Sequence, residues 1–359
     1  MTGNSDCTNR NSIDFFKASC YITGCNPYRI IAIVRNLEKY IIYACLGASM
    51  AATSWAAEND KPACYHLAIE GDREAQFQLA ECYRTGNEMV QDWELAYQWY
   101  KKSAEQDYTP AMHALSLCLI DGYGTEKNPQ EGIKILTICA ERGYMKSIHA
   151  IINVYMFGRE GIEKNLNVAK KWAKIGAEQG DVACMSTYGM LLVDPSFGIN
   201  QTEEGKMWLR RAAQGGDQVA QFELGLIYFN GSRGENKDYV EAKNWFVKAA
   251  AQEHASAIFM LATLYHQGLG VETNYELAAQ LCLRAALMNN ANAQANLAVL
   301  YTQGRGVPEN LDHALYWAKQ AAENGDPHGD RVYHIIRLYY NSDNVVIPDT
   351  PQDIDFNSL

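Results

Sequence analysis

His113 and His149 are the pair of residues best placed to share a chemical task, because they stand 36 positions apart in a chain that repeats with about that period. An imidazole nitrogen is a common metal ligand. Equivalent side chains of two stacked helix pairs, however, would lie roughly 10 Å apart, too far for one ion to bridge. Since no further ligand is spaced to help them, we expect exposed or core histidines, no metal site and no cofactor.

The cysteines offer a second kind of chemistry, the disulfide bond. The chain has ten of them and no Cys-x-x-Cys motif, which disfavours a zinc ribbon or a thioredoxin-type site. Cys64 and Cys82 flank a turn near Asp72, and in an antiparallel helical hairpin such residues can face each other. The sequence leaves two interpretations open, a disulfide between them or two buried thiols.

Signatures of common catalytic sites are missing from the sequence. It contains no Gly-x-Ser-x-Gly, Ser-x-x-Lys, His-Glu-x-x-His or Gly-x-x-x-x-Gly-Lys motif. Two glycine pairs, Gly268 with Gly270 and Gly304 with Gly306, invite a nucleotide-binding interpretation. They follow predicted helices rather than strands, so the end of a helix explains them better. We therefore predict a protein that is not an enzyme.

A repeat in the sequence indicates the elements that position these residues. Each unit of the repeat has one position, which we call the slot, that holds an aromatic or large apolar residue. The slot is occupied by Trp99, Ile135, Trp172, Trp208, Trp245, Leu281 and Trp317. Five residues later the sequence always has alanine, at Ala104, Ala140, Ala177, Ala213, Ala250, Ala286 and Ala322. Steps of 36 or 37 residues over seven units indicate a repeat architecture.

The other half of each unit has the pattern small-x-x-x-Leu-Gly/Ala-x-x-Tyr, as in the segments 220–228, 257–265 and 293–301. Offsets of 0, +4, +5 and +8 share one face of a helix. Glycines then end that helix, and a second helix begins near Asp238, Tyr275 or Asn310. Each unit is therefore predicted to be an antiparallel helix pair, which must stack on its neighbours to bury both faces.

This pattern resembles the Sel1-like repeat family, a relative of the tetratricopeptide repeats, over roughly residues 57–340. The resemblance implies an all-α fold, a right-handed α-solenoid of stacked antiparallel helix pairs. Two units depart from the family pattern. The second lacks the usual Tyr and Trp and has Leu119 and Ile135, whereas the fourth has Val193-Asp-Pro-Ser-Phe-Gly198 in place of a glycine pair. We expect looser or altered packing in both.

The sequence predicts five regions in chain order. They are an N-terminal extension with a signal peptide (1–56), a capping half-repeat (57–74), seven repeats (75–328), a C-terminal capping helix (329–340) and a flexible acidic tail (341–359).

The signal peptide is predicted from a basic flank and an apolar core. Arg29, Arg35 and Lys39 precede an apolar run of about 14 residues, which starts at Tyr40 and is followed by the small residues Ser54 and Ala56. This pattern predicts secretion, cleavage after Ala56 and no membrane insertion of the mature chain, hence a periplasmic location in a bacterium. An uncleaved anchor and a buried helix are the alternatives.

The formal net charge of −11 argues against nucleic acid as the main partner, because phosphate binding requires a basic surface. A hydrophobic content of 48% is that of a folded protein. We therefore expect a protein or peptide partner, and a monomer in the absence of that partner.

The resemblance also implies where such a partner would bind, because the first helices of stacked pairs line the concave side. Mapping the family pattern onto this chain predicts partner-binding residues at Phe77, His113, His149, Met190, Phe222, Leu226, Phe229, Phe259 and His266. An exposed apolar stripe usually marks a binding site. The alternative is that these side chains pack against neighbouring helices.

The predicted function is that of a non-enzymatic, exported interaction scaffold, for which the family suggests an immunity, adaptor or host-contact role. Phe222, Phe229 and Phe259 are the expected apolar anchors. The alternative is a cell-wall or β-lactam hydrolase of the cysteine-rich Sel1-like type. Those relatives have a regular cysteine pair in every repeat, which this sequence lacks.

Overall fold

The computed structural model describes residues 61–194 and 202–340. Within these ranges the chain forms sixteen α-helices and no β-strand. The predicted signal peptide (1–56) and acidic tail (341–359) lie outside the described residues. No helix of the described part is both long and apolar enough to cross a membrane.

The chain divides into two compact units, the first ending at Gln106 and the second starting at Asp107. In the first unit, a short helix precedes one helix pair: α4 (Tyr65–Glu70), α5 (Arg73–Thr85) and α6 (Trp93–Glu105). Helix α5 packs against both α4 and α6.

The second unit alternates two kinds of helix, which we call A and B helices for the first and second member of each pair. The A helices are α7 (Thr109–Asp121), α9 (Met145–Phe157), α11 (Val182–Val193), α13 (Gln218–Asn230), α15 (Ala255–Gln267) and α17 (Ala291–Gln303). The B helices are α8 (Pro129–Glu141), α10 (Leu166–Glu178), α12 (Thr202–Gln214), α14 (Tyr239–Ala250), α16 (Tyr275–Leu287) and α18 (Leu311–Glu323), and α19 (Pro327–Tyr340) follows the last pair.

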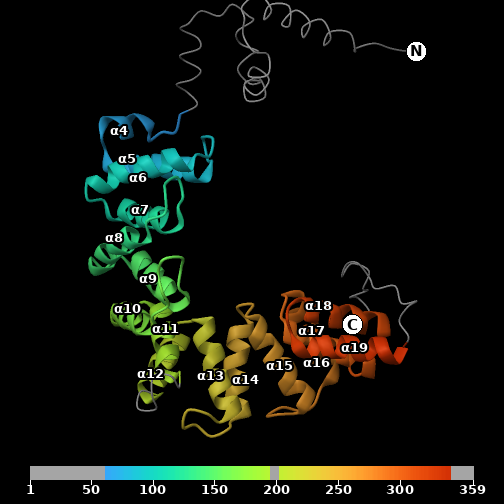
Figure 1. Cartoon of the computed structure of the whole chain (residues 1–359). Coiled ribbons are helices and arrows are strands. Elements are labelled where there is room, and N and C mark those ends of the chain that lie inside the picture. Colours follow the sequence, from blue (N-terminus) through green and yellow to red (C-terminus); the bar gives the residue numbers. More distant parts are fainter. Residues whose placement is uncertain (1–60, 195–201, 341–359) are drawn as a thin grey trace, which may run out of the picture. The chain divides into compact units, whose positions relative to one another are not determined.

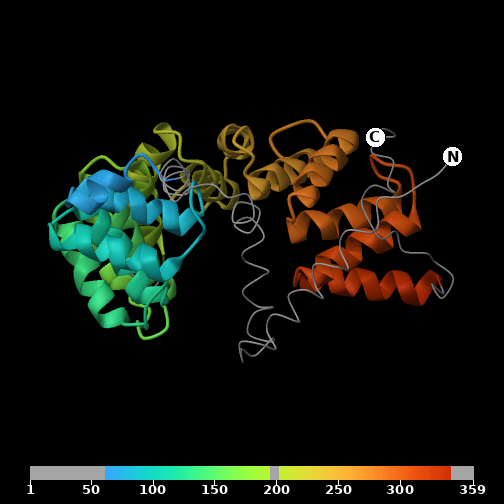
Figure 2. The same ribbon diagram turned by 90° about the horizontal axis from the view of Figure 1, so that it is seen from above.

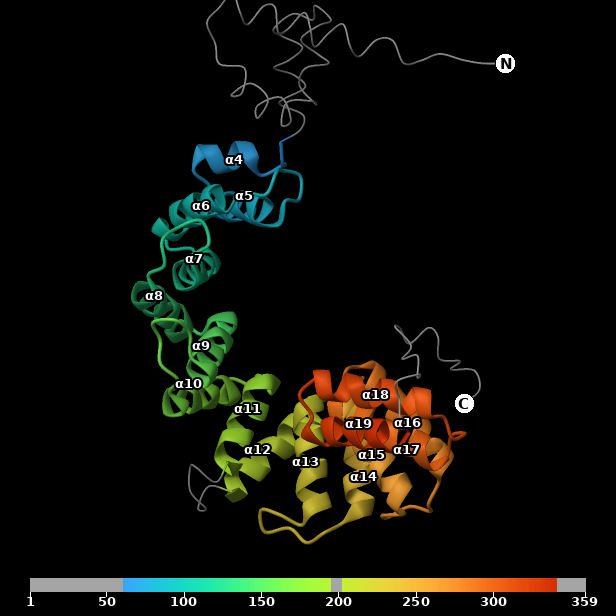
Figure 3. The same ribbon diagram turned by 45° about the vertical axis from the view of Figure 1, so that its right-hand side comes forward.

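Within each unit, helices that are neighbours in the sequence are also neighbours in space (Figure 1). Each A helix packs against its own B helix and against the B helix before it within the unit. Figure 2 shows the same chain order among the orange and red helices from above, and Figure 3 shows α17, α18 and α19 packed together. This consecutive packing confirms the predicted all-α repeat fold.

Short polar residues start most of these helices. Their side-chain oxygens accept a hydrogen bond from a backbone N–H of the first turn, as Asp238 and Asn310 do at the predicted starts of α14 and α18. Glycines with positive φ follow several A helices, for example Gly268 after α15 and Gly304 after α17. The predicted turn chemistry therefore accounts for both ends of the helix pairs.

In the fourth repeat the packing is altered, as one of the two expectations had it, and not looser. A Cβ on Gly205 of α12 would lie only 2.9 Å from the carbonyl oxygen of Gly189 in α11. In the second repeat, a Cβ on Gly132 of α8 would lie similarly close to the backbone carbonyl oxygen of Ser116 in α7. Both repeats lack some consensus residues, but glycine allows their two helices to approach each other directly.

Candidate interaction surface and repeat junctions

Of the nine residues predicted to bind a partner, eight lie on A helices and Phe77 lies on α5; all nine are half-buried. Phe77 belongs to the first unit and the other eight belong to the second. A half-buried side chain both packs against the protein and offers area to a ligand. The two alternatives from the sequence, binding and packing, therefore both remain open at these positions.

Five of the nine residues share one position of the repeat, two residues after its small anchor residue, and three of these five contact the start of the following A helix. His113 Nδ1 lies 2.9 Å from Ser147 Oγ. His149 Nε2 lies 2.9 Å from Asp181 Oδ1. The ring of Phe222 stacks on that of His254 with centroids 4.6 Å apart. We call these contacts repeat junctions.

Four of the six apolar members of the nine lie on α13 and α15. Phe222, Leu226, Phe229 and Phe259 pack against the buried cluster around Phe246 and remain partly accessible. Phe229 makes an edge-to-face contact with Tyr239, with ring centroids 5.5 Å apart. We call these four side chains the α13–α15 apolar surface.

Two of the nine lie at other places in the second unit. Met190 packs against the buried cluster around Leu209. His266 is in edge contact with Tyr275, with ring centroids 5.3 Å apart. Burial lowers the pKa of His266, and the positive charge of Arg305 lowers it further.

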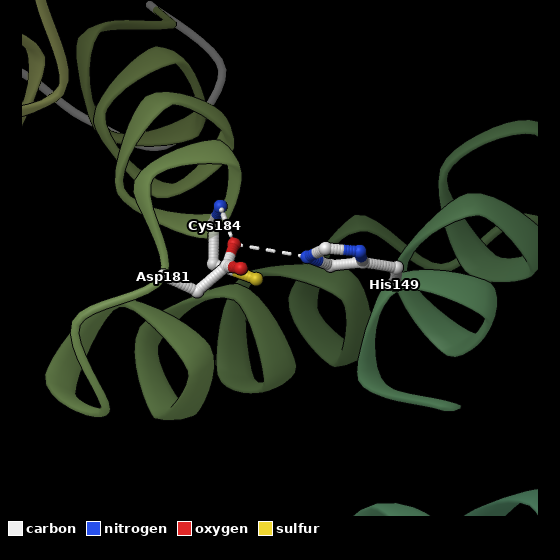
Figure 4. Close-up of side chains that lie close together, drawn as sticks. All are labelled: His149, Asp181 and Cys184. Carbon is white, nitrogen blue, oxygen red and sulfur yellow. Dashed lines mark hydrogen bonds and ion pairs between the residues drawn. The ribbon is translucent and has the colours of Figure 1, made fainter. Parts of the chain in front are cut away.

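The junction between the third and fourth repeats brings together three groups that can ligate a metal. One donor atom from each of His149, Asp181 and Cys184 lies within 4.8 Å of the others. Figure 4 shows the imidazole of α9 pointing at the carboxylate that precedes α11, with the Cys184 sulfur beside that carboxylate. The expectation that no further ligand lies near His149 was wrong, because Asp181 and Cys184 come from the next repeat, 32 and 35 positions further on.

Hydrogen bonds set the electrostatics of this group. Burial raises the pKa of Asp181, but hydrogen bonds from His149 and from the Cys184 backbone outweigh that effect and leave the pKa lowered. The Cys184 thiol is fully buried, and burial together with the nearby Asp181 carboxylate raises its pKa. Without a metal, the stable state is therefore a carboxylate beside a protonated thiol.

Cys64 and Cys82 lie together in the first unit, packed in one apolar cluster. Both are free thiols in the structure, and a hydrogen bond between them affects their pKa values. The two residues do face each other across the hairpin, and the disulfide itself stays a prediction. Burial raises the pKa of both thiols, so neither is a ready nucleophile.

Buried glutamines form a network that we did not anticipate. Gln294 is 1% exposed; its amide donates to the Ala286 carbonyl at 3.1 Å and accepts from Asn324 at 2.8 Å. Gln76 and Gln221 do the same in their own repeats. The equivalent partners are Ala68 and Gln106 in the first unit, and Ala213 and Gln252 in the second. The signal in the sequence was Ala-Gln at the start of an A helix.

Comparison with known proteins explains this regular geometry. Seven segments of the chain match the Sel1 repeat, at residues 73–108, 109–144, 153–181, 188–217, 218–254, 255–290 and 291–326. The chain belongs to the Sel1-repeat family. The resemblance inferred from the tryptophan and alanine spacing is confirmed.

Chitin synthase regulatory factor 2 of Schizosaccharomyces pombe is 23% identical over 220 aligned residues, which cover 58% of this Sel1-repeat chain and 43% of that protein. The chain thus spans less than half the length of this curated relative. A crystal structure described as c5321, a protective antigen present in uropathogenic Escherichia coli strains displaying an SLR fold, is 27% identical. Its TM-score is 0.63, with 77% of this chain and 59% of that chain covered.

The Sel1 repeat protein from Oxalobacter formigenes has a TM-score of 0.65 at 21% identity, over 76% of this chain and 78% of that chain. This second likeness concerns the fold alone. Together the two structures confirm the Sel1-like helical repeat fold.

Proposed function

We propose that this Sel1-repeat protein is a non-enzymatic scaffold that binds a protein or peptide through the α13–α15 apolar surface. The observation that carries the proposal is that Phe222, Leu226, Phe229 and Phe259, on two successive A helices, stay partly accessible instead of closing into the core. Partly accessible aromatic side chains supply contact area at little entropic cost, since packing already holds them.

The surface itself defines the class of partner. Its four side chains are apolar, and three of them are aromatic. The proposed ligand is therefore an apolar peptide segment.

A non-enzymatic role also agrees with the cysteines and with the relatives. The thiols of Cys64, Cys82, Cys139, Cys184 and Cys282 have pKa values raised by burial. A thiolate nucleophile is therefore disfavoured at these positions. The curated relative quoted above is named as a regulatory factor. Purified protein should hydrolyse nitrocefin no faster than buffer, and turnover would favour the hydrolase alternative.

Export belongs to the same proposal, and its support is the basic flank and apolar run before Ala56. In that setting the scaffold would act in the periplasm as an immunity or adaptor protein. Cell fractionation followed by mass spectrometry of the N-terminus tests this part alone. A mature chain starting after Ala56 in the periplasm is expected, and an intact chain in the cytosol contradicts export.

The binding proposal is tested by site-specific photo-cross-linking of the protein in its native extract, with the probe at Thr263 beside the surface. We compare the wild type with Phe259→Ala and with the control Val247→Ser, which changes a 49% exposed side chain on B helix α14. The cross-linked partner should lose at least about tenfold in yield with Phe259→Ala and be unchanged with Val247→Ser. Equal yields from Phe259→Ala and wild type would contradict the proposed surface.

A further inference from the structure

The junction of the third and fourth repeats brings three potential metal ligands together. His149 comes from α9, Asp181 caps the start of α11, and Cys184 lies in the first turn of α11. Their donor atoms lie within 4.8 Å of one another, as ligands of one ion must. Nitrogen, oxygen and sulfur together are a ligand set that zinc accepts.

The sulfur atom of Cys184 has room because a glycine replaces a larger residue on the neighbouring helix. Five of the six equivalent positions in the other repeats hold alanine, at Ala75, Ala111, Ala220, Ala257 and Ala293, and the sixth holds Ser147. The larger thiol fits because α10 has Gly176 opposite it, where an added Cβ would lie only 2.4 Å from the sulfur. Later repeats have Ala212, Ala249 and Ala285 at the position of Gly176, each fully buried. The chain therefore makes room for a sulfur at this junction.

The preceding junction has the same geometry without the same chemistry. There His113 contacts Ser147 and the ring of Tyr144, so a hydroxyl and a phenol stand where the next repeat has a thiol and a carboxylate. Among the described residues, His149, Asp181 and Cys184 are the one group of three His, Cys, Asp or Glu side chains close enough to hold an ion. The two junctions therefore share the position of the histidine and differ in the residues that surround it.

We propose that His149, Asp181 and Cys184 bind one zinc ion across the junction of the third and fourth repeats. A buried thiolate with an imidazole selects zinc over magnesium or calcium, which prefer oxygen ligands. On binding, the S–H proton leaves to solvent and a zinc–sulfur bond replaces it. The His149 side chain is 40% exposed, so water can enter and occupy a fourth position.

The ion would join α9 to α11 and so fix one repeat against the next. The contact between His149 and Asp181 is otherwise a single hydrogen bond at a partly exposed site. A metal held from both sides would stiffen this junction, because its ligands come from two repeats. The site is separate from the α13–α15 apolar surface, so the zinc proposal does not depend on the proposed binding function.

The test uses Co²⁺ as a spectroscopic probe for the zinc position, on the reduced full-length chain. One equivalent of Co²⁺ should produce a thiolate-to-cobalt absorption band, and Zn²⁺ should displace it. Cys184→Ala should remove the band while leaving the helical circular dichroism intact, since alanine occupies the equivalent position in five other repeats. His149→Phe should weaken Co²⁺ binding by about tenfold or more.

The matched control is His113→Phe, which alters the equivalent histidine of the preceding junction and should leave the Co²⁺ band unchanged. Cys184→Ala also keeps the thiols of Cys64 and Cys82, so it measures any binding at other cysteines. A second measurement is the melting temperature, which Zn²⁺ should raise for the wild type and not for Cys184→Ala. A band that survives in Cys184→Ala, or no band in the wild type, would overturn the proposal.

Discussion

The junction between the second and third repeats and the junction between the third and fourth use the same backbone positions for different chemistry. In the first of them, His113 lies against Ser147, whose hydroxyl also hydrogen-bonds the thiol of Cys139 on the preceding B helix. In the second, His149 meets a carboxylate, and the thiol has moved to the A helix as Cys184. The repeat determines where these side chains lie, and their types determine what they can do.

The two junctions also differ in the burial of their histidines and in the charged groups beside them. Burial lowers the pKa of His113 to about 4, and the positive charge of Lys146 contributes further. This histidine therefore stays neutral in the folded protein at pH 7. His149 has a carboxylate at 2.9 Å and a side chain that is 40% exposed. One histidine is a packed neutral group, whereas the other is partly exposed and lies against a carboxylate.

The largest expected effect comes from filling the gap that holds the Cys184 sulfur. Gly176→Ala adds a Cβ at 2.4 Å from that sulfur, so we expect a loss of about 3 kcal/mol in the free energy of unfolding. Adding Cys184→Ala to the same chain should restore about 1 kcal/mol, because it removes the clashing atom. Urea denaturation of the three variants measures both values, and a double variant no more stable than Gly176→Ala would contradict the pairing.

The next largest effect is expected at the earlier junction. His113→Ala leaves the fully buried Ser147 hydroxyl without its imidazole partner, at a cost of about 2 kcal/mol. His113→Phe should cost less, because Phe222 and Phe259 occupy the equivalent position in later repeats. Denaturation midpoints compare the two variants. If His113→Phe lowers the stability as much as His113→Ala does, the shape of this side chain matters less than its hydrogen bond.

Acid should weaken the same junction. The folded pKa of His113 is about 4, below the value of about 6.5 expected in the unfolded chain, so the unfolded state binds the proton first as the pH falls. Stability is therefore lost between pH 6.5 and 4, by about 1 kcal/mol between pH 7.5 and 5.5. Measuring stability against pH for the wild type and His113→Phe isolates this contribution. Parallel curves would show that His113 is not the group responsible.

The smallest effect is expected at His149 in metal-free protein. Its hydrogen bond to Asp181 is partly exposed, so His149→Ala should cost only about 0.5 kcal/mol. The same measurement with excess Zn²⁺ should widen the difference, since the wild type alone would gain the ion. If excess Zn²⁺ leaves the stability difference between the wild type and His149→Ala unchanged, the result contradicts zinc binding by His149.

The sequence was sufficient to predict the helix pairs, because each has a strong local signal. Caps such as Asp238 and Asn310, and glycines such as Gly268, mark helix ends through contacts within a few residues. The alanine found five residues after each tryptophan slot was an incomplete guide to packing. Ser103, Cys139 and Gly176 occupy the position before it, and all are buried although their types differ.

The candidate sites were harder to predict because they depend on residues one repeat apart. Phe222 and Phe259 were identified as apolar anchors, yet the sequence did not reveal that Phe222 also stacks on His254. The glutamine network was missed because Ala-Gln looks like any polar step at the start of a helix. Partners some 30 residues away satisfy those amides.

By itself the sequence determined the repeat, its division into helix pairs and the identity of the residues at each position, since these follow from local spacing and from turn chemistry. Only the tertiary structure decided that His149 meets Asp181 and Cys184 while His113 meets Ser147. The reason is physical: stacking places the second position after one anchor against the start of the next A helix. A cluster of potential ligands arises only where the residues that two successive repeats bring into contact are chemically complementary.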